Sequence, residues 1–320
     1  MIDDHPSVST RQSTRTRRRS RLGATDGFRD RGAEIATIEG MKQPFPEEAL
    51  RYVGDDPRIL ESTADAVLLF GNSKVAKIAS PELIERESFV ISGQAGELPV
   101  TTPHLVDWGV NWLVMDEVEF DRGRWSDEEL IEAVRQMARL HDEFEDAIVL
   151  TSPVLRKPFS RDLGRLFRET ASVAAHLSNE LIEVLEDPAV LTEALDQLPL
   201  TLTHGDPWPH NMLRDPQGIV WIDWTQASAA PAVADLASWL DQTPFAIGRT
   251  IDRRAHIDAY LEARSKEVDA GAFARALDAA RVAWFLAFDA PNLSSLADES
   301  AALAETMVRE AERALAAVRG

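Results

Sequence analysis

The sequence contains no cysteine, and this absence excludes disulfide bonds as well as metal sites built from thiolates. It also lacks any apolar run near the roughly 20 residues that a helix needs to cross a bilayer. We therefore expect no membrane partner. A chain without disulfides fits the reducing cytoplasm, which is the location that we expect.

Positive charge is the other scarce feature. The 320 residues include 34 Lys and Arg against 54 Asp and Glu, which gives a formal net charge of −20. Residues 1–40 hold more arginines than acidic residues, so the rest of the chain is more acidic still. An acidic body binds nucleic-acid backbone poorly, and we expect no nucleic-acid partner. It suits a cationic small molecule, although acidic surfaces also serve solubility alone.

The first 40 residues are rich in Arg, Ser and Thr, most of all in RQSTRTRRRSR at 11–21. No apolar segment follows this stretch, so it does not predict a secretory signal. With so few hydrophobic side chains, we expect residues 1–40 to form a disordered, dispensable tail. Two alternatives stay open: a tail that binds nucleic acid or a membrane surface, and sequence that precedes a working start at Met41.

The next part of the chain, 41–120, has the pattern of a small β-rich lobe. The expected elements are a helix, a hairpin turning at Gly71-Asn72, a second helix and two strands, at 45–53, 66–79, 80–96 and 104–120.

The remainder, 121–320, has the pattern of a larger helical lobe. A capping box at Ser126 and Glu129 predicts a helix at 126–144. Further helices are expected near 162–195, 232–242, 252–265, 268–289 and 297–318, with short strands at 200–204 and 218–224. The predicted class is α+β, and the cleft between two such lobes is the natural ligand site.

Lys77 lies in the apolar strand KVAKIA, and by itself it fits a lysine at a sheet edge whose amine reaches water. Glu87 changes this interpretation, because it falls in the middle of the apolar stripe of the following helix. A carboxylate on a buried face is unfavourable unless it is paired. Lys77, in the strand that leads into the helix, is the expected partner.

The stretch HGDPWPHN at 204–211 places Asp206 and Asn211 five residues apart in a loop. Asp223 follows at the end of an apolar strand. The oxygens of Asp and Asn suit a hard cation such as Mg²⁺, which prefers a few protein ligands together with phosphate oxygens. Asp206 would then be free to accept a proton from a substrate hydroxyl.

Three other interpretations of this loop compete. His204, Asp206 and His210 could bind zinc or iron, but no third histidine or recognised ligand spacing accompanies them. Pro207 and Pro209 could simply stiffen a structural turn. A Ser-His-Asp hydrolase would need a G-x-S-x-G motif, which the sequence lacks. The lysine, the glutamate and the later aspartate, present in order, favour phosphoryl transfer.

HGDPWPHN, followed by VWIDW and ADLA, resembles the aminoglycoside phosphotransferase and choline kinase-like family, a small-molecule branch of the protein-kinase-like fold. The resemblance covers about residues 45–290. It implies a two-lobe fold, with a nucleotide-binding lobe at 41–120. The helical lobe at 121–320 would carry the catalytic loop, the metal site and the substrate pocket.

The resemblance also implies roles for individual residues. Asp206 matches the catalytic base, Asn211 and Asp223 match the Mg²⁺ ligands, and Lys77 matches the lysine that holds the ATP phosphates, with Glu87 as its helix partner. The expected structural supports of the loop are His204 and Asp235. The linker expected to receive adenine through its backbone consists of Met115, Asp116, Glu117 and Val118.

Some positions depart from the family pattern. Trp208 stands where small residues or histidine are usual, and could pack under the loop or face the substrate. Thr225-Gln226 replaces an acidic position, and AAP at 229–231 replaces GDP. The expected phosphate loop LESTADA has no glycine, so Ser62 and Thr63 would donate to phosphate or form a plain polar turn.

Together these features predict an ATP- and Mg²⁺-dependent phosphotransferase that acts on a hydroxyl group of a small molecule. A cationic acceptor, similar to an aminoglycoside or an amino alcohol, is a hypothesis based on the acidic body, with Asp241 and Asp289 as candidate contacts. The alternative is a catalytically silent kinase-fold protein that binds nucleotide and regulates a partner. The presence of all five central residues argues against it.

Overall fold

The computed structural model describes residues 45–54, 56–63, 65–121, 123–157, 163, 167 and 177–320, without the side chains of 294–299. By its internal contacts the chain divides into Met1–Gly40 and Met41–Gly320, and the expected tail lies outside the described residues. Among the described helices, none combines the length and the apolar character needed to cross a membrane.

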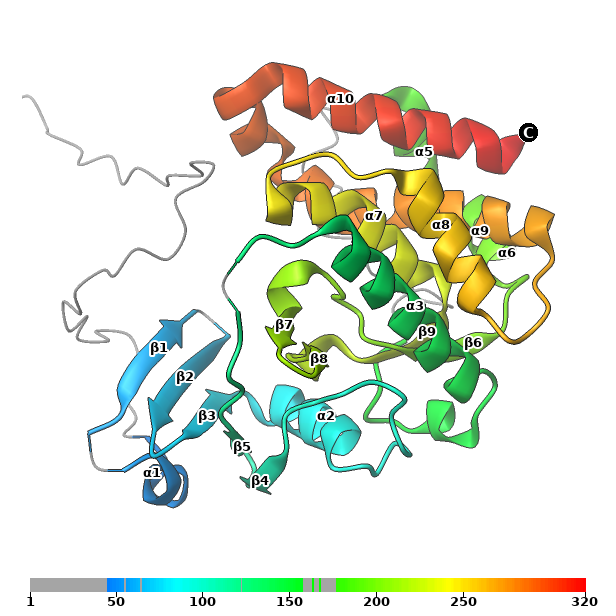
Figure 1. Cartoon of the computed structure of the whole chain (residues 1–320). Helices are drawn as coiled ribbons and strands as arrows, with labels where there is room; N and C mark the ends of the chain where they lie inside the picture. The colour runs from blue at the N-terminus through cyan, green and yellow to red at the C-terminus, as the bar shows by residue number, and fades with distance from the viewer. Residues whose placement is uncertain are drawn as a thin grey trace, which may run out of the picture. The chain divides into compact units, whose positions relative to one another are not determined.

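The first described part forms a five-stranded antiparallel sheet with the strand order β1-β2-β3-β5-β4 (Figure 1). Its elements are α1 (Glu47–Val53), β1 (Arg58–Ser62), β2 (Ala66–Gly71), β3 (Lys74–Ala79), α2 (Pro81–Ile91), β4 (Leu105–Trp108) and β5 (Trp112–Asp116). The predicted helices and strand pairs are confirmed. Strand β1 was not predicted, because all five of its side chains are exposed and show no apolar alternation.

The two faces of this sheet pack against different helices. One cluster joins α1 to the sheet through Ala49, Val53, Val67, Leu69, Ala76, Ile78, Trp112 and Val114. The other joins α2 to the opposite face through Ala79, Ile84, Leu113 and Met115. Because alternate residues of a strand share a face, Lys77 lies on the α2 side, as Ala79 does. The sheet therefore directs the lysine toward the helix that carries Glu87.

The turn between β2 and β3 lies one residue later than predicted. Gly71 pairs with Lys74 as part of the ladder, and Asn72 and Ser73 form the turn with φ of 51° and 56°. Two positive φ values match the type I′ hairpin turn. Gly71 is needed for another reason, since a Cβ there would lie 1.9 Å from the carbonyl oxygen of Val53 in α1.

The second described part is mainly helical (Figure 1). Its helices are α3 (Asp127–Phe144), α5 (Asn179–Glu186), α6 (Ala189–Leu195), α7 (Val233–Ile247), α8 (Arg253–Ala263), α9 (Ala270–Trp284) and α10 (Leu293–Arg319). Its strands are β6 (Leu200–Thr203), β7 (Met212–Asp215), β8 (Gly218–Trp221) and β9 (Ser228–Pro231), paired as β6 with β9 and β7 with β8. The capping box of α3 is formed as predicted, with both of its hydrogen bonds.

Two of these strands were not predicted, and one predicted helix is divided in two. Strands β7 and β9 have the sequences MLRD and SAAP, which are too short and too poor in β-branched residues to stand out. The helix expected over 162–195 contains two separate helices in its described part, because Pro188 between them has no amide N–H to continue α5. The earlier portion of that range lies largely outside the described residues.

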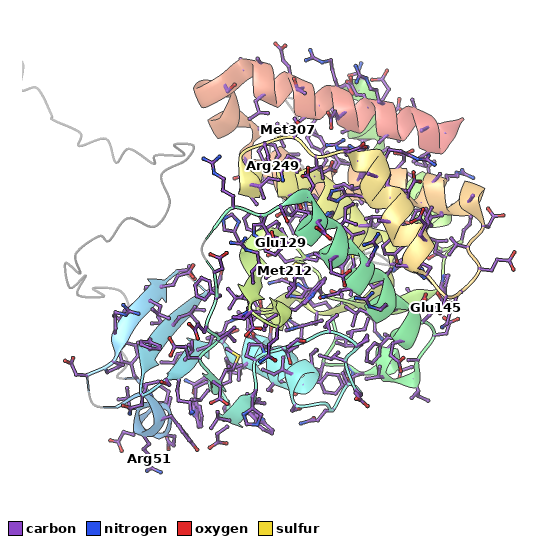
Figure 2. The ribbon with its side chains drawn as sticks, in the orientation of Figure 1. Arg51, Glu129, Glu145, Met212, Arg249 and Met307 are labelled. Carbon is purple, nitrogen blue, oxygen red and sulfur yellow. The ribbon has the colours of Figure 1, made fainter. Side chains whose placement is uncertain are left out.

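Aromatic side chains fill the core of the helical part. Trp221, Trp224 and Trp239 are fully buried. Met212 of β7, labelled in Figure 2, is 3 % exposed and belongs to the same apolar cluster. Helix α9 ends at Trp284 and continues as a single π-helical turn, Phe285–Asp289. Such turns interrupt regular helices and often occur at functional sites.

The close approach of α1 to Gly71 predicts an unequal pair of glycine variants. Gly71→Ala should destabilise the protein by roughly 1–3 kcal/mol, because the new methyl group must displace the α1 backbone. Gly271→Ala, near the start of α9, has room for its methyl group and should be neutral or stabilising by up to about 1 kcal/mol. Urea unfolding of both variants measures the difference, and equal stabilities would contradict the packing argument.

Candidate active site

The loop HGDPWPHN leaves β6, makes a 3₁₀ turn η3 (Pro209–Asn211) and enters β7. Gly205 has φ of 85°, and a Cβ on it would lie 2.1 Å from the carbonyl oxygen of Gln226. This position therefore requires glycine for its conformation and for its close approach to the segment after Asp223. The packing fixes the direction in which Asp206 leaves the loop.

Asp235, at the start of α7, holds this loop in place. One of its oxygens accepts a hydrogen bond from the amide of His204 at 2.7 Å, and the other accepts from the amide of Gly205 at 2.9 Å. His141 of α3 lies 3.2 Å from the first oxygen, and its other ring nitrogen bonds the Tyr260 hydroxyl at 2.7 Å. Asp235 is 1 % exposed. This arrangement agrees with the structural role expected for Asp235.

His204 is fully buried, and the structure uses both of its ring nitrogens. Its Nδ1 faces the amide of Asp206 at 3.3 Å, and its Nε2 faces the carbonyl oxygen of Ile222 at 2.9 Å. An amide donates and a carbonyl accepts, so these partners assign the proton to Nε2. Burial lowers the pKa of His204, which favours this neutral form. Neither nitrogen is available to a metal ion, and the interpretation as a histidine-based metal site fails here.

Asp206 lies at the centre of the site. Asn211 donates from Nδ2 to its backbone oxygen at 2.9 Å and to Oδ2 at 2.8 Å. Burial raises the pKa of Asp206 to about 6, and the nearby charge of Asp223 adds to the effect of burial. A base is most effective when its pKa lies near the working pH. The Asp206 carboxyl therefore holds a proton at a higher pH than an ordinary aspartate does.

Lys77 connects the sheet to the loop region. Its Nζ lies 2.7 Å from Glu87 Oε2, with an angle outside the hydrogen-bond range, and donates to Asp223 Oδ1 at 2.6 Å. The side chains of Lys77 and Glu87 are only 8 % and 1 % exposed. Burial alone would lower the pKa of Lys77, but the two carboxylates outweigh it and raise the pKa. The ion pair predicted from helix periodicity is confirmed, and it extends to Asp223.

Asp223 itself adopts a left-handed backbone conformation, with φ of 62°. Burial would raise the pKa of its carboxyl, but Lys77 and the hydroxyl of Thr225 hold that pKa below its usual value. Thr225, which replaces an acidic position of the family pattern, donates to Asp223 Oδ1 at 2.7 Å. Oδ1 thus carries both contacts, and Oδ2 has no hydrogen bond within the described residues.

The donor set fits Mg²⁺. Asn211 donates from Nδ2 to Asp206, and its Oδ1 has no hydrogen bond within the described residues. That oxygen and Asp223 Oδ2 could therefore both bind a metal ion. No cluster of three or more His, Cys, Asp or Glu side chains suited to a metal occurs in the described parts of the chain. Two oxygen ligands are what Mg²⁺ takes from a protein when phosphate oxygens complete its coordination.

The other expected site residues lie in the sheet part. The Thr63 hydroxyl accepts from the amide of Ala66 at 3.1 Å and donates to its carbonyl oxygen at 3.2 Å, so it closes the β1–β2 turn. In the linker, the amide of Asp116 donates to the backbone carbonyl oxygen of His104, and the amide of Glu117 donates to that of Ser73. Ser62 ends β1, Met115 lies in β5, and the Val118 amide has no hydrogen bond within the described residues.

Trp208 packs against its own loop. Its ring centroid lies 4.4 Å from that of His210. Its indole nitrogen is buried and makes no hydrogen bond within the described residues. The indole still lies close enough to the Asp206 carboxyl to oppose the rise in its pKa. Trp208 thus contacts its own loop and also lies near the Asp206 carboxyl.

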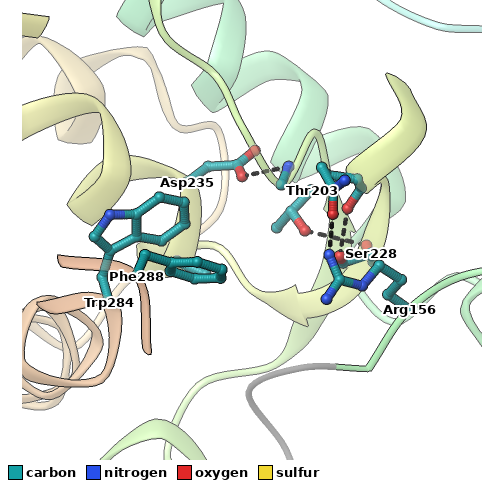
Figure 3. A pocket seen from close by; sticks show the side chains of 9 residues that line it. Arg156, Thr203, Ser228, Asp235, Trp284 and Phe288 are labelled. Atoms are coloured by element: carbon teal, nitrogen blue, oxygen red, sulfur yellow. Dashed lines mark hydrogen bonds between the residues drawn. The ribbon is translucent and has the colours of Figure 1, made fainter. Parts of the chain in front are cut away.

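Next to the loop lies a narrow cavity that the sequence did not reveal (Figure 3). Its lining consists of Arg156, Thr203, Gly205, Gln226, Ser228, Ala234, Asp235, Trp284 and Phe288. The ring centroids of Trp284, at the end of α9, and Phe288, in the π-helical turn, lie 4.4 Å apart. Arg156 could not be recognised from sequence, because the residue that its side chain contacts, Gln226, is 70 positions away.

The acidic residues expected to contact an acceptor, Asp241 and Asp289, do not line this cavity. Asp241 is paired with Arg253 at 3.0 Å and with Arg281 at 3.1 Å. Asp289 makes no ion pair within the described residues, and burial together with the charge of Asp241 raises its pKa to about 7. The charge of Asp241 is therefore compensated by two arginines, and the raised pKa of Asp289 weakens its negative charge near neutral pH.

Comparisons with known proteins show similarity to one sequence family and to several solved structures. The sequence model of the phosphotransferase enzyme family matches residues 73–277, a range that contains all the central site residues. No curated protein matches the chain. A choline/ethanolamine kinase family protein from Mesorhizobium loti is similar in structure, at 18 % identity over 84 % of this chain and 93 % of that chain, with a TM-score of 0.55.

Two further solved structures are similar. One is a macrolide 2′-phosphotransferase from Brachybacterium faecium, at 21 % identity over 82 % of this chain and 96 % of that chain, with a TM-score of 0.53. The other is an amicoumacin kinase in complex with AMP-PNP and Ca²⁺, at 13 % identity over 83 % of this chain and 92 % of that chain, with a TM-score of 0.61. At these identities the likeness shows the fold, which is the expected kinase-like one.

The raised pKa of Asp206 predicts a stabilising substitution. The folded protein binds the Asp206 proton more tightly than the unfolded chain, so wild type loses stability as the pH rises from 3.8 to about 6. Asp206→Asn avoids this loss and should be more stable than wild type by about 1–2 kcal/mol above that window, with little difference below it. Urea unfolding at several pH values tests this, with the exposed Asp56→Asn as control. A pH-independent difference would contradict the assignment.

The buried ion pair predicts a second stability difference. Lys77→Met leaves Glu87 buried without its cation and should destabilise the protein by about 3–5 kcal/mol. The double variant Lys77→Met/Glu87→Leu removes both charges and should recover most of that loss. Guanidinium unfolding of the single and double variants gives the comparison. If the single and double variants were equally stable, the loss of stability would not come from the unpaired charge of Glu87.

Proposed function

Because this chain belongs to the phosphotransferase enzyme family, we propose that it transfers the γ-phosphate of ATP to a hydroxyl group of a small molecule, with Mg²⁺ as cofactor. One observation carries the proposal. Lys77 of the sheet lies within 2.7 Å of both Glu87 and Asp223, which are far apart in sequence. This contact joins 41–120, the proposed nucleotide-binding lobe, to 121–320, the proposed catalytic lobe, and so supports a common site.

Asp206 is the proposed catalytic base. Its partly buried carboxyl, with a pKa of about 6, accepts the proton of the acceptor hydroxyl as that oxygen bonds to phosphorus. Asn211 fixes the orientation of the carboxyl through the bond to Oδ2. His204 and Asp235 act only through the loop backbone, by holding its amides.

Asn211 and Asp223 are the proposed metal ligands, through the oxygens that lack other partners. Bound Mg²⁺ supplies positive charge that neutralises the phosphate oxygens during transfer. Lys77 is the proposed phosphate contact, and Glu87 keeps its amine in position when Asp223 turns to the metal. Phosphoryl transfer depends mainly on such positioning and charge neutralisation, so these side chains are sufficient for it.

The adenine is proposed to bind the linker at 115–118. Since the amides of Asp116 and Glu117 are already used, the Val118 amide is the donor that remains for the base. Ser62 and Thr63 are proposed to lie over the phosphates at the β1–β2 turn. The amicoumacin kinase that shares this fold binds AMP-PNP, which supports an adenine nucleotide. The cytoplasm, where ATP is abundant, is the proposed location.

Removal of the base should separate catalysis from binding. Asp206→Asn should lower kcat by roughly 10²–10⁴-fold, because the carboxylate no longer accepts the proton. Its affinity for Mg²⁺ and AMP-PNP should stay close to that of wild type. ADP release with a panel of hydroxyl compounds gives kcat, and calorimetry with AMP-PNP gives affinity. For wild type, kcat/KM should rise as the pH passes about 6, because Asp206 must be ionised.

The alternative, a silent nucleotide-binding regulator, makes a different prediction in the same assays. Such a protein would bind Mg²⁺ and AMP-PNP but release no ADP beyond background with any acceptor, and Asp206→Asn would leave that background unchanged. A wild-type protein that binds no nucleotide would contradict both functions.

A further inference from the structure

Arg156 lies on one side of the cavity beside the catalytic loop, opposite Trp284 and Phe288 (Figure 3). Its backbone pairs with β9 on either side of Ser228, so its position is fixed by the sheet. Its side chain bonds the Oε1 of Gln226, whose carbonyl oxygen packs against Gly205. Arg156 and Gly205, the residue before Asp206, thus both contact Gln226 and line the same cavity.

The charge of Arg156 has no partner of opposite sign within the described residues. Its hydrogen-bond partner Gln226 is neutral and takes one of the five N–H donors of the guanidinium. Other buried arginines of this acidic protein differ. Arg214, Arg264 and Arg281 each pair with at least two carboxylates. Burial without a compensating anion lowers the pKa of Arg156.

A second arginine adds to this positive charge. Arg86 of α2 donates to the carbonyl oxygens of Val154 at 3.1 Å and of Thr225 at 2.5 Å, and it too has no carboxylate partner within the described residues. Burial lowers the pKa of Arg86 most and the charge of Arg156 lowers it further, while Glu82 and Glu85 of the same helix act in the opposite direction. Arg156 thus adds positive charge next to Arg86 in a protein whose net charge is −20. An anion between or beside them would offset that charge.

The carboxyl and hydroxyl groups of the cavity already have partners, whereas the buried indole nitrogen of Trp284 makes no hydrogen bond within the described residues. Asp235 directs both oxygens to the loop amides and His141. The hydroxyls of Thr203 and Ser228 donate to nearby carbonyl oxygens. The cavity lining therefore offers hydrogen-bond donors, and the Arg156 guanidinium is the charged one. Its other wall is aromatic, and Phe288 is 37 % exposed at the edge.

From these contacts we propose that the acceptor carries a carboxylate or phosphate group and that Arg156 binds it. The guanidinium fork matches the two oxygens of such a group. The Trp284–Phe288 pair covers the apolar part of the same molecule, and its hydroxyl reaches Asp206. This inference rests on the proposed function, and it replaces the cationic acceptor expected from the acidic composition with an anionic one.

Three compounds with one carbon skeleton and different charges test the proposal. Glycerate is anionic, glycerol is neutral and 3-amino-1,2-propanediol is cationic. With AMP-PNP and Mg²⁺ filling the nucleotide site, glycerate should raise the Tm of wild type, and the other two should raise it less. Arg156→Gln should shift the half-saturating glycerate concentration at least about tenfold upward, the effect of losing a charged hydrogen bond. Arg156→Lys should fall between them.

The matched control is Arg51→Gln, which removes an exposed arginine of α1; Arg51 is labelled in Figure 2. This variant should respond to glycerate as wild type does. In ADP release with ATP, Arg156→Gln should raise KM for glycerate and leave kcat nearly unchanged. The proposal fails if glycerate gives wild type no added stability, if Arg156→Gln responds as wild type does, or if 3-amino-1,2-propanediol is preferred. An equal fall in kcat for all three compounds would assign Arg156 to the transferred phosphate instead.

Inorganic phosphate, added in place of glycerate, separates an acceptor from a free anion. Stabilisation by phosphate that needs Arg156, without any by glycerate, would assign the site to a free anion and reject the acceptor assignment. Failure of the proposed function shows elsewhere, as absent binding of AMP-PNP. The Tm of each variant without ligand reports whether it is folded.

Discussion

The carboxylate of Asp235 is the contact on which the active site depends. It satisfies two loop amides that would otherwise be buried without partners, and it ties them to α3 through His141. Leaving such buried groups unpaired is costly, so the loop has one conformation. The positions of Gly205 and Asp206 depend on that conformation. Gly205 can pack on Gln226 only there, and Asp206 then projects toward Asn211.

Charge is distributed unevenly around this fixed loop. A single lysine serves two carboxylates, and the more exposed one, Asp223, holds its negative charge more firmly than the buried Glu87. Arg86 and Arg156, by contrast, make no ion pair within the described chain. In the proposed function, Lys77 and Asp223 would meet phosphates and a metal, and Arg156 would meet an anionic group of the acceptor. A strongly acidic composition concealed this positive charge.

The sequence was informative wherever a physical pattern was local. Helix periodicity placed Glu87 on a buried face and so predicted its ion pair, and the capping box predicted the start of α3. The H-G-D motif indicated Asp206 and Asn211 because both lie in one loop. Sequence patterns did not predict contacts between residues that lie far apart in the chain. Arg156 meets Gln226 through the β6–β9 sheet, whose second strand has no β-strand signature. The pairing of Asp241 with arginines from two other helices was equally invisible.

The position of Lys77 has a consequence for how ligands enter. Its bond to Asp223 joins the two lobes across 146 positions of sequence, and it occupies the groups that both nucleotide and metal would use. A phosphate that draws the amine away leaves Asp223 without its counter-charge, and a cation that captures Asp223 releases the amine. Each arrival thus makes the other more favourable. By linkage, such coupling must be reciprocal, so the proposed function implies that nucleotide and metal would bind cooperatively.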